Sequence, residues 1–237
     1  MTPTDVPSLL RTLAEANDRA AARRAAWSVL QEACVAGGAS IEATAAEAVQ
    51  GLLRLLGQSG TEWVAEVLGV LDATACALGE WEAQQQWSSK PWLYDAEVGW
   101  ETAVAELLAQ GLSAVRPALT DGDPEVRSMA AALMGDASVE WTADVDLLLA
   151  AEAAEPHALA RACLAEAAVT LALRAPAARL PGRVKQWLRD PEAVVRFRVA
   201  RIARTAPAAE DAQLAVLADG VYDADCGAME TVWPAEV

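Results

Sequence analysis

The feature that most constrains the fold is a segment that occurs twice, 69 residues apart, in the C-terminal half of the chain. Residues 119–133 read LTDGDPEVRSMAAAL, and residues 188–202 read LRDPEAVVRFRVARI. The matched positions are Leu119 with Leu188, Asp121 with Asp190, Val126-Arg127 with Val195-Arg196, and Ala131 with Ala200. Because a unit that repeats at this spacing usually stacks on its own copies, the repeat sets the architecture of the region.

A third copy lies between these two. Residues 155–161 end in Arg161, which follows Arg127 by 34 residues and precedes Arg196 by 35. Toward the N-terminus the copies weaken, although residues 22–30 and 63–71 keep a related apolar spacing. The sequence therefore predicts about 35 residues for each unit, which is enough for two helices and their turns.

The local chemistry of the repeat is that of a helix start. Asp121 or Asp123 is placed to cap the following helix, and Pro124 suits its first turn. Val126, Ala130 and Leu133 recur at helical spacing and would face a neighbouring helix.

The order Leu, Asp-Pro turn, Val-Arg and Ala-Ala-x-Leu resembles the HEAT repeat, in the short variety similar to that of phycobilin-lyase-like repeat proteins. The resemblance covers residues 119–135, 153–170 and 188–204. It implies an α-solenoid in which Arg127 and Arg196 tie a helix to the acidic turn of an adjacent repeat. Together with Asp121 and Asp190, these arginines are then structural residues of the repeat.

Composition indicates an all-α protein. Alanine and leucine dominate, there are only one Phe and two Tyr, and no long alternating run of β-branched residues occurs. We predict five or six antiparallel helix pairs that form a single HEAT-like α-solenoid over residues 1–218, with an insertion near 80–95 and an acidic, irregular tail over 219–237. The expected helices are 6–16, 18–36, 40–56, 61–78, 95–110, 112–119, 124–134, 142–153, 157–173, 179–188, 192–205 and 208–217.

Charge is divided unevenly along this acidic chain, whose formal net charge is −16. Residues 174–204 carry nine basic and two acidic side chains, whereas residues 205–237 carry seven acidic side chains and no basic one. The negative electrostatic potential of such a chain favours basic partners and repels a phosphate backbone over most of the surface. We call residues 174–204 the basic stripe. Its charges either line a groove for an anionic ligand or are balanced by the acidic residues that follow in 205–237, and we favour the second interpretation.

Targeting signals are not evident in the sequence. The N-terminus lacks a basic segment followed by an apolar one, and no apolar stretch is long enough to span a membrane. The widely spaced residues Cys34, Cys76, Cys163 and Cys226 are typical of reduced thiols, so we expect a cytoplasmic protein. The high alanine and arginine content is typical of a GC-rich bacterial gene.

Catalytic motifs are not found either. His157 is the single histidine, and no nucleophile motif accompanies it. The cysteines lack zinc-ligand spacing, and the acids near Asp223 and Asp225 lack the later glutamate of a calcium loop. We therefore expect a binding module rather than an enzyme, with no metal and no cofactor.

Tryptophans gather where the repeat is interrupted. Trp and Tyr among acids are typical of protein-binding hot spots, although the same rings could fill a gap between two halves of a solenoid. The candidate partner-binding residues are Trp81, Trp87, Trp92, Tyr94 and Trp100, with Glu80, Glu82, Asp95 and Glu97 around them. The other tryptophans within helical stretches, Trp27, Trp63, Trp141 and Trp187, are expected to pack between helices.

Three functional hypotheses follow. The first is a protein-binding scaffold, because small acidic HEAT-like proteins resemble bacterial immunity or antitoxin-type inhibitors that engage a basic toxin or enzyme. The second is a nucleic-acid-binding protein resembling the HEAT-like DNA glycosylases, which would use Arg196, Arg198, Arg201 and Arg204. The third is a chromophore handler resembling the bilin lyases, which only the repeat supports.

Overall fold

The computed structural model describes residues 4–36, 40–58, 62–87, 99–174, 180–204 and 212–230. Within these ranges every regular element is helical except two strands of two residues each, so the predicted all-α class is correct. The chain divides into two compact units, residues 1–118 and 119–237, which we describe separately. In the described segments, no helix is long and apolar enough to cross a membrane.

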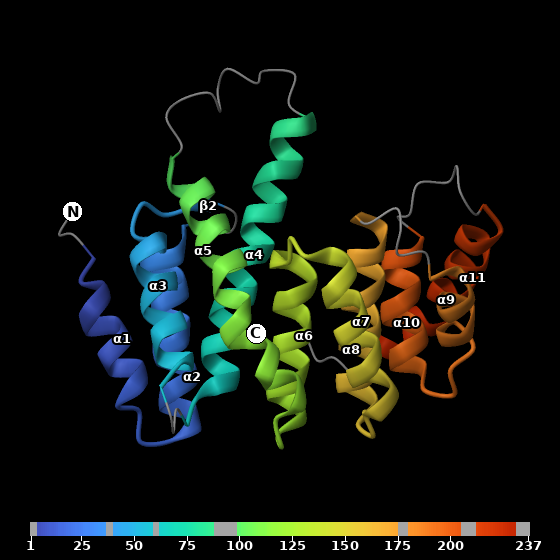
Figure 1. The fold of residues 1–237 in the computed structure, drawn as a ribbon, viewed down its shortest axis with the longest axis horizontal. Coiled ribbons are helices and arrows are strands. Elements are labelled where there is room, and N and C mark those ends of the chain that lie inside the picture. Colours follow the sequence, from blue (N-terminus) through green and yellow to red (C-terminus); the bar gives the residue numbers. More distant parts are fainter. Residues whose placement is uncertain are drawn as a thin grey trace. The chain divides into compact units, whose positions relative to one another are not determined.

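The described part of the N-terminal unit contains five helices, in which α3 packs against α1, α4 and α5, while α2 packs against α1 and α4 (Figure 1). Asp5 and Asp18 cap the first two helices by accepting hydrogen bonds from the backbone N–H groups of Ser8 and Ala21. The helices are α1 (Val6–Ala14), α2 (Arg19–Val29), α3 (Ala45–Leu56), α4 (Val64–Trp87) and α5 (Gly99–Val115).

The connection between α2 and α3 differs from the prediction. We expected one helix through residue 36 and another that starts at Ser40, but α2 continues only into a π-helical turn, Leu30–Cys34. The chain then forms β1 (Val35–Ala36) and β2 (Ser40–Ile41), which pair antiparallel. The hydroxyl of Thr44 donates to the carbonyl of Ala33 at 3.0 Å and anchors the start of α3 to this turn.

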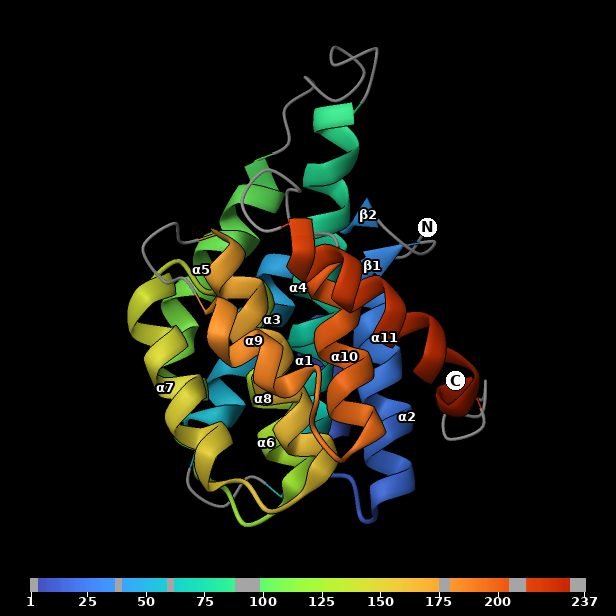
Figure 2. The same cartoon turned by 90° about the vertical axis from the view of Figure 1, so that its right-hand side faces the viewer.

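The C-terminal unit is built around α8, which packs against α6, α7 and α10 (Figure 2). Helix α10 in turn packs against α9 and α11. Glycine allows α6 to approach α8 closely, because a Cβ atom on Gly135 would lie only 3.1 Å from the Cα of Ala167. The helices are α6 (Pro124–Ala137), α7 (Trp141–Ala154), α8 (Ala158–Arg174), α9 (Pro181–Trp187), α10 (Ala193–Ala203) and α11 (Ala212–Glu230); a 3-10 turn, Arg116–Thr120, precedes α6.

The last helix is longer than the sequence suggested. We expected a helix over 208–217 followed by an irregular tail, but α11 continues to Glu230. Among its described side chains, Ala218 and Asp225 are buried, whereas Val216, Asp219 and Asp223 are exposed.

Candidate functional site: an arginine ladder and the exposed tryptophans

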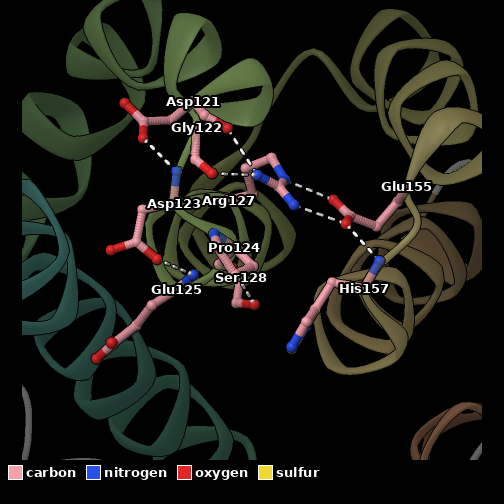
Figure 3. Close-up of polar contacts among 9 residues, drawn as sticks. All are labelled: Asp121, Gly122, Asp123, Pro124, Glu125, Arg127, Ser128, Glu155 and His157. Carbon is pink, nitrogen blue, oxygen red and sulfur yellow. Dashed lines mark hydrogen bonds and ion pairs between the residues drawn. The ribbon is translucent and has the colours of Figure 1, made fainter.

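Arg127 joins the start of α6 to the turn that precedes α8 (Figure 3). Its Nε donates to Oε2 of Glu155 at 2.5 Å, and its Nη2 donates to Oε1 at 2.7 Å. Its Nη1 donates to the backbone carbonyls of Asp121 and Gly122 at 2.7 and 3.2 Å. Only 13% of the Arg127 side chain and 2% of the Glu155 side chain is exposed, so water hardly screens this pair.

The acidic turns position both partners of this pair. Asp121 accepts the backbone N–H of Asp123 at 2.8 Å, and Asp123 accepts that of Glu125 at 2.8 Å, so Asp123 is the residue that caps α6 (Figure 3). In the next turn, Oε1 of Glu155 also accepts the backbone N–H of His157 at 2.8 Å. The carboxylate of Glu155 therefore closes its own turn and binds Arg127 at the same time.

The second copy of the repeat makes the same contacts. Nε and Nη2 of Arg196 donate to the two carboxylate oxygens of Asp225 at 2.8 Å each. Nη1 of Arg196 donates to the carbonyls of Asp190 and Pro191 at 2.7 and 3.0 Å. Repeated sequence and repeated contacts thus coincide.

The middle copy makes a weaker contact. Nη2 of Arg161 donates to Oδ1 of Asp190 at 2.9 Å, but the Nε of Arg161 is buried without a hydrogen-bond partner. We call the three pairs Arg127–Glu155, Arg161–Asp190 and Arg196–Asp225 the arginine ladder. Each arginine reaches an acid 28 or 29 residues further along the chain, and Glu155, Asp190 and Asp225 are themselves 35 residues apart.

The ladder stabilises the charged forms of Arg127, Glu155 and Arg196. The hydrogen bonds from Arg127 lower the pKa of Glu155 below its usual value, despite burial that acts in the opposite direction, and the N–H of His157 adds to the effect. The same bonds raise the pKa of Arg127, and those to Asp225 raise the pKa of Arg196. A permanently charged, internally satisfied pair is suited to holding helices together rather than to proton transfer.

Among the described contacts, four of the nine basic residues of the stripe pair with acids of the C-terminal unit. Arg183 pairs with Glu152, whose Oε1 also accepts the indole N–H of Trp187 at 3.1 Å. Both Arg198 and Arg201 bind Glu166 of α8. The sequence had suggested that the acidic tail balances the stripe, but Glu152 and Glu166 lie in the preceding helices α7 and α8. Among the acids of these described ion pairs, only Asp225 comes from α11.

Two basic residues of the stripe border an open depression. Lys185 and Arg189 line it with Asp190 and Pro191, and its volume is about 440 Å³. The carboxylate of Asp190 is already engaged by Arg161 and by the backbone N–H of Glu192. Lys185 and Arg189 make this depression a candidate site for an anionic ligand.

Most side chains of the tryptophan cluster predicted from the sequence are not among those that the structure describes. Trp100 is exposed at the start of α5, and its indole N–H donates to the carbonyl of Ile41 at 3.1 Å. Trp92, Tyr94, Asp95 and Glu97 lie outside the described residues. Glu80, Trp81, Glu82 and Trp87 belong to the last turns of α4, where the backbone alone is described. The partner-binding role of the cluster stays a prediction.

The remaining tryptophans divide into two kinds. Trp187 is buried, as expected for packing between helices, and Trp63 is half-buried with its indole N–H on the carbonyl of Ala16. Trp27 and Trp141, by contrast, are 54% and 38% exposed, so their prediction as packing residues was wrong. Leu147 of α7 is exposed as well. For Leu147 alone the sequence contained a signal of exposure, because three consecutive leucines, 147–149, cannot all face one core.

Comparison with family models, with curated proteins and with solved structures finds no match for this chain. The kinship with HEAT repeats therefore rests on the repeated residues and enters below as a proposal.

Proposed function

We propose that this chain is a non-catalytic scaffold of HEAT-like repeats that binds another protein, and that this partner is basic. An immunity or antitoxin-type inhibitor of a basic toxin or enzyme is the specific form of the proposal. The formal net charge of −16 supports it, because an acidic surface accelerates association with a basic protein.

The observation that carries the proposal is the contrast between engaged charges and exposed tryptophans. Of the arginines that a nucleic-acid-binding groove would need, Arg196 is held by Asp225, while Arg198 and Arg201 share Glu166. Arg204 lies over the ring of Tyr222, with its guanidinium carbon 3.9 Å from the ring centroid. Trp27 and Trp141, by contrast, are exposed. Large aromatic side chains of this kind often anchor protein interfaces.

The experiment that tests the proposal has two arms. In the first, the purified chain captures proteins from its own cells, and each captured protein is then purified and mixed again with the chain. We expect one basic protein to bind again with defined stoichiometry at physiological salt. If none does, the protein-binding role is wrong.

In the second arm, the chain is titrated with a DNA duplex at low salt, beside a variant in which Lys185 and Arg189 are changed to Glu. These two residues border the depression and are not among the partners of Glu166, so the variant tests the basic surface without breaking those ion pairs. We expect neither protein to bind. Salt-sensitive binding by the wild type that disappears in the variant would favour the nucleic-acid alternative.

A further inference from the structure

Three large apolar side chains are exposed at one corner of the C-terminal unit. Val139 is 67% exposed in the connection between α6 and α7, and Trp141 begins α7. Leu173, which is 42% exposed, lies at the end of α8. We call Val139, Trp141 and Leu173 the corner patch.

A pair of hydrogen bonds brings the three residues to the same end of the unit. Nη1 of Arg174 donates to the carbonyls of Gly135 and Asp136 at 3.1 and 3.0 Å. Leu173 precedes this arginine, and the two carbonyls belong to the last turn of α6, just before Val139. The end of α8 is therefore fixed against the connection that carries the rest of the patch.

The corner is also held rigidly from within. The indole N–H of Trp141 donates to the carbonyl of Ser138 at 2.8 Å. The hydroxyl of Ser138 donates to Oδ2 of the buried Asp144 at 2.6 Å and accepts the backbone N–H of Glu140 at 3.2 Å. Because these polar groups already have partners, they need no new ones when the Trp141 ring contacts another protein, which lowers the cost of ordering it.

Charge indicates what covers the patch. Residues 136–155 contain six acids and no basic side chain; of these acids, Glu140 is exposed directly before α7 and Asp146 is exposed in its second turn. The one cation described at this corner is Arg174, whose guanidinium is bound to the carbonyls of Gly135 and Asp136. A second copy of this chain would bring the same acids against them, and anionic lipids or nucleic acids would be repelled in the same way. A basic polypeptide has the complementary charge.

We propose that the corner patch is a docking site for a segment of a partner protein that presents apolar side chains flanked by Lys or Arg. This inference rests on the proposed protein-binding function and adds to it the place and the chemistry of the contact. The apolar side chains of the segment pack on Val139, Trp141 and Leu173, and its cations lie near Glu140 and Asp146.

The probe for the test is a fluorescently labelled synthetic peptide of about four helical turns, with Leu and Trp on one face and Lys on the other. An analogue with Glu in place of Lys is the charge control. Each peptide is titrated by fluorescence anisotropy into the wild type, into a double variant with Val139→Ser and Leu173→Ser, and into Val216→Ser. Val216 is the matched control, because it is an exposed apolar residue of the same unit on α11. Thermal melts verify that each variant is folded.

We expect the wild type and Val216→Ser to bind the Lys peptide equally, and the double variant to bind it at least about tenfold more weakly. Asp146→Lys should weaken binding of the Lys peptide and strengthen binding of the Glu analogue. Equal binding by the wild type and the double variant would overturn the site, and no binding of the Lys peptide by the wild type would overturn the partner chemistry. Self-association that the double variant abolishes, measured by sedimentation, would assign the patch to a second copy and also overturn the proposal.

The proposed function is tested separately by the captured and purified partner. If that partner binds the double variant as tightly as the wild type, the corner patch is wrong while the protein-binding role stands. If no protein partner exists, both fail together.

Discussion

Arg127 and Glu155 form a bidentate ion pair that joins the start of α6 to the turn before α8 across 28 residues of sequence. The same geometry recurs between Arg196 and Asp225, which are 29 residues apart. Arg127 and Arg196 thus each close their own turn through two backbone carbonyls and reach an acid 28 or 29 residues further along the chain. These contacts give a structural role to the arginine that both copies of the segment contain.

Replacing Arg127 with Leu should destabilise the C-terminal unit by about 3 kcal/mol, because it leaves the buried carboxylate of Glu155 without its counter-charge. Urea unfolding followed by circular dichroism measures the loss, and hydrogen exchange at α8 amides assigns it to this unit. Arg19→Leu is the control, because Arg19 is 45% exposed in its pair with Glu66 and should contribute less than about 1 kcal/mol. A similar loss in both variants would contradict the structural weight given to the ladder.

The middle arginine should tolerate lysine better than its neighbours do. Arg161 makes one hydrogen bond to Asp190 and leaves its Nε buried and unbonded, so an ammonium group can replace that single contact. We expect Arg161→Lys to change the unfolding free energy by less than about 0.5 kcal/mol, and Arg127→Lys to lower it by about 1 to 2 kcal/mol. Equal effects in urea titrations of the two variants would show that the bidentate geometry of the Arg127 pair does not contribute to stability.

Acid should weaken the first pair of the ladder. The pKa of Glu155 is lower in the folded protein than in the unfolded chain, so its contribution to stability is complete above its unfolded pKa of about 4.3. That contribution is lost as the pH falls through the lower, folded pKa. The unfolding free energy of the wild type should therefore fall more steeply below about pH 4.3 than that of Glu155→Gln. Parallel curves for the two proteins would refute the assignment.

The attachment of α11 should depend on Asp225 and Tyr222. Asp225 binds Arg196, and the ring of Tyr222 stacks on Phe197 with centroids 5.0 Å apart. Changing both residues to Ala should expose α11 to limited proteolysis while α6 to α8 stay protected. Asp223→Ala is the matched control, because Asp223 is exposed on the same helix, and it should be cut no faster than the wild type. Equal cleavage of the two variants would mean that these contacts do not hold the helix.

The sequence predicts the helical class and most of the C-terminal helices because signals of several kinds agree there. Asp-Pro turns, helical spacing and the repeat all point to the same boundaries around Pro124 and Glu192. The weaker copies of the N-terminal half carry no such agreement, and the largest errors lie there and at α11.

The errors have physical causes that local patterns do not contain. The turn Leu30–Cys34 and the pairing of Val35 with Ile41 depend on bonds to residues further along, such as Glu42 N–H to the carbonyl of Cys34. The exposure of Trp141 depends on which side of α7 faces α8, and a helix with apolar residues on every side does not reveal that side.

The central claim is that the repeated arginine is a structural tie between successive helical units. A double-mutant cycle on Arg127 and Glu155, both changed to Leu singly and together, measures this tie directly through the unfolding free energy of the C-terminal unit. We predict a coupling free energy of about 2 kcal/mol, with the double variant more stable than the sum of the two single losses implies. A coupling near zero would contradict the account.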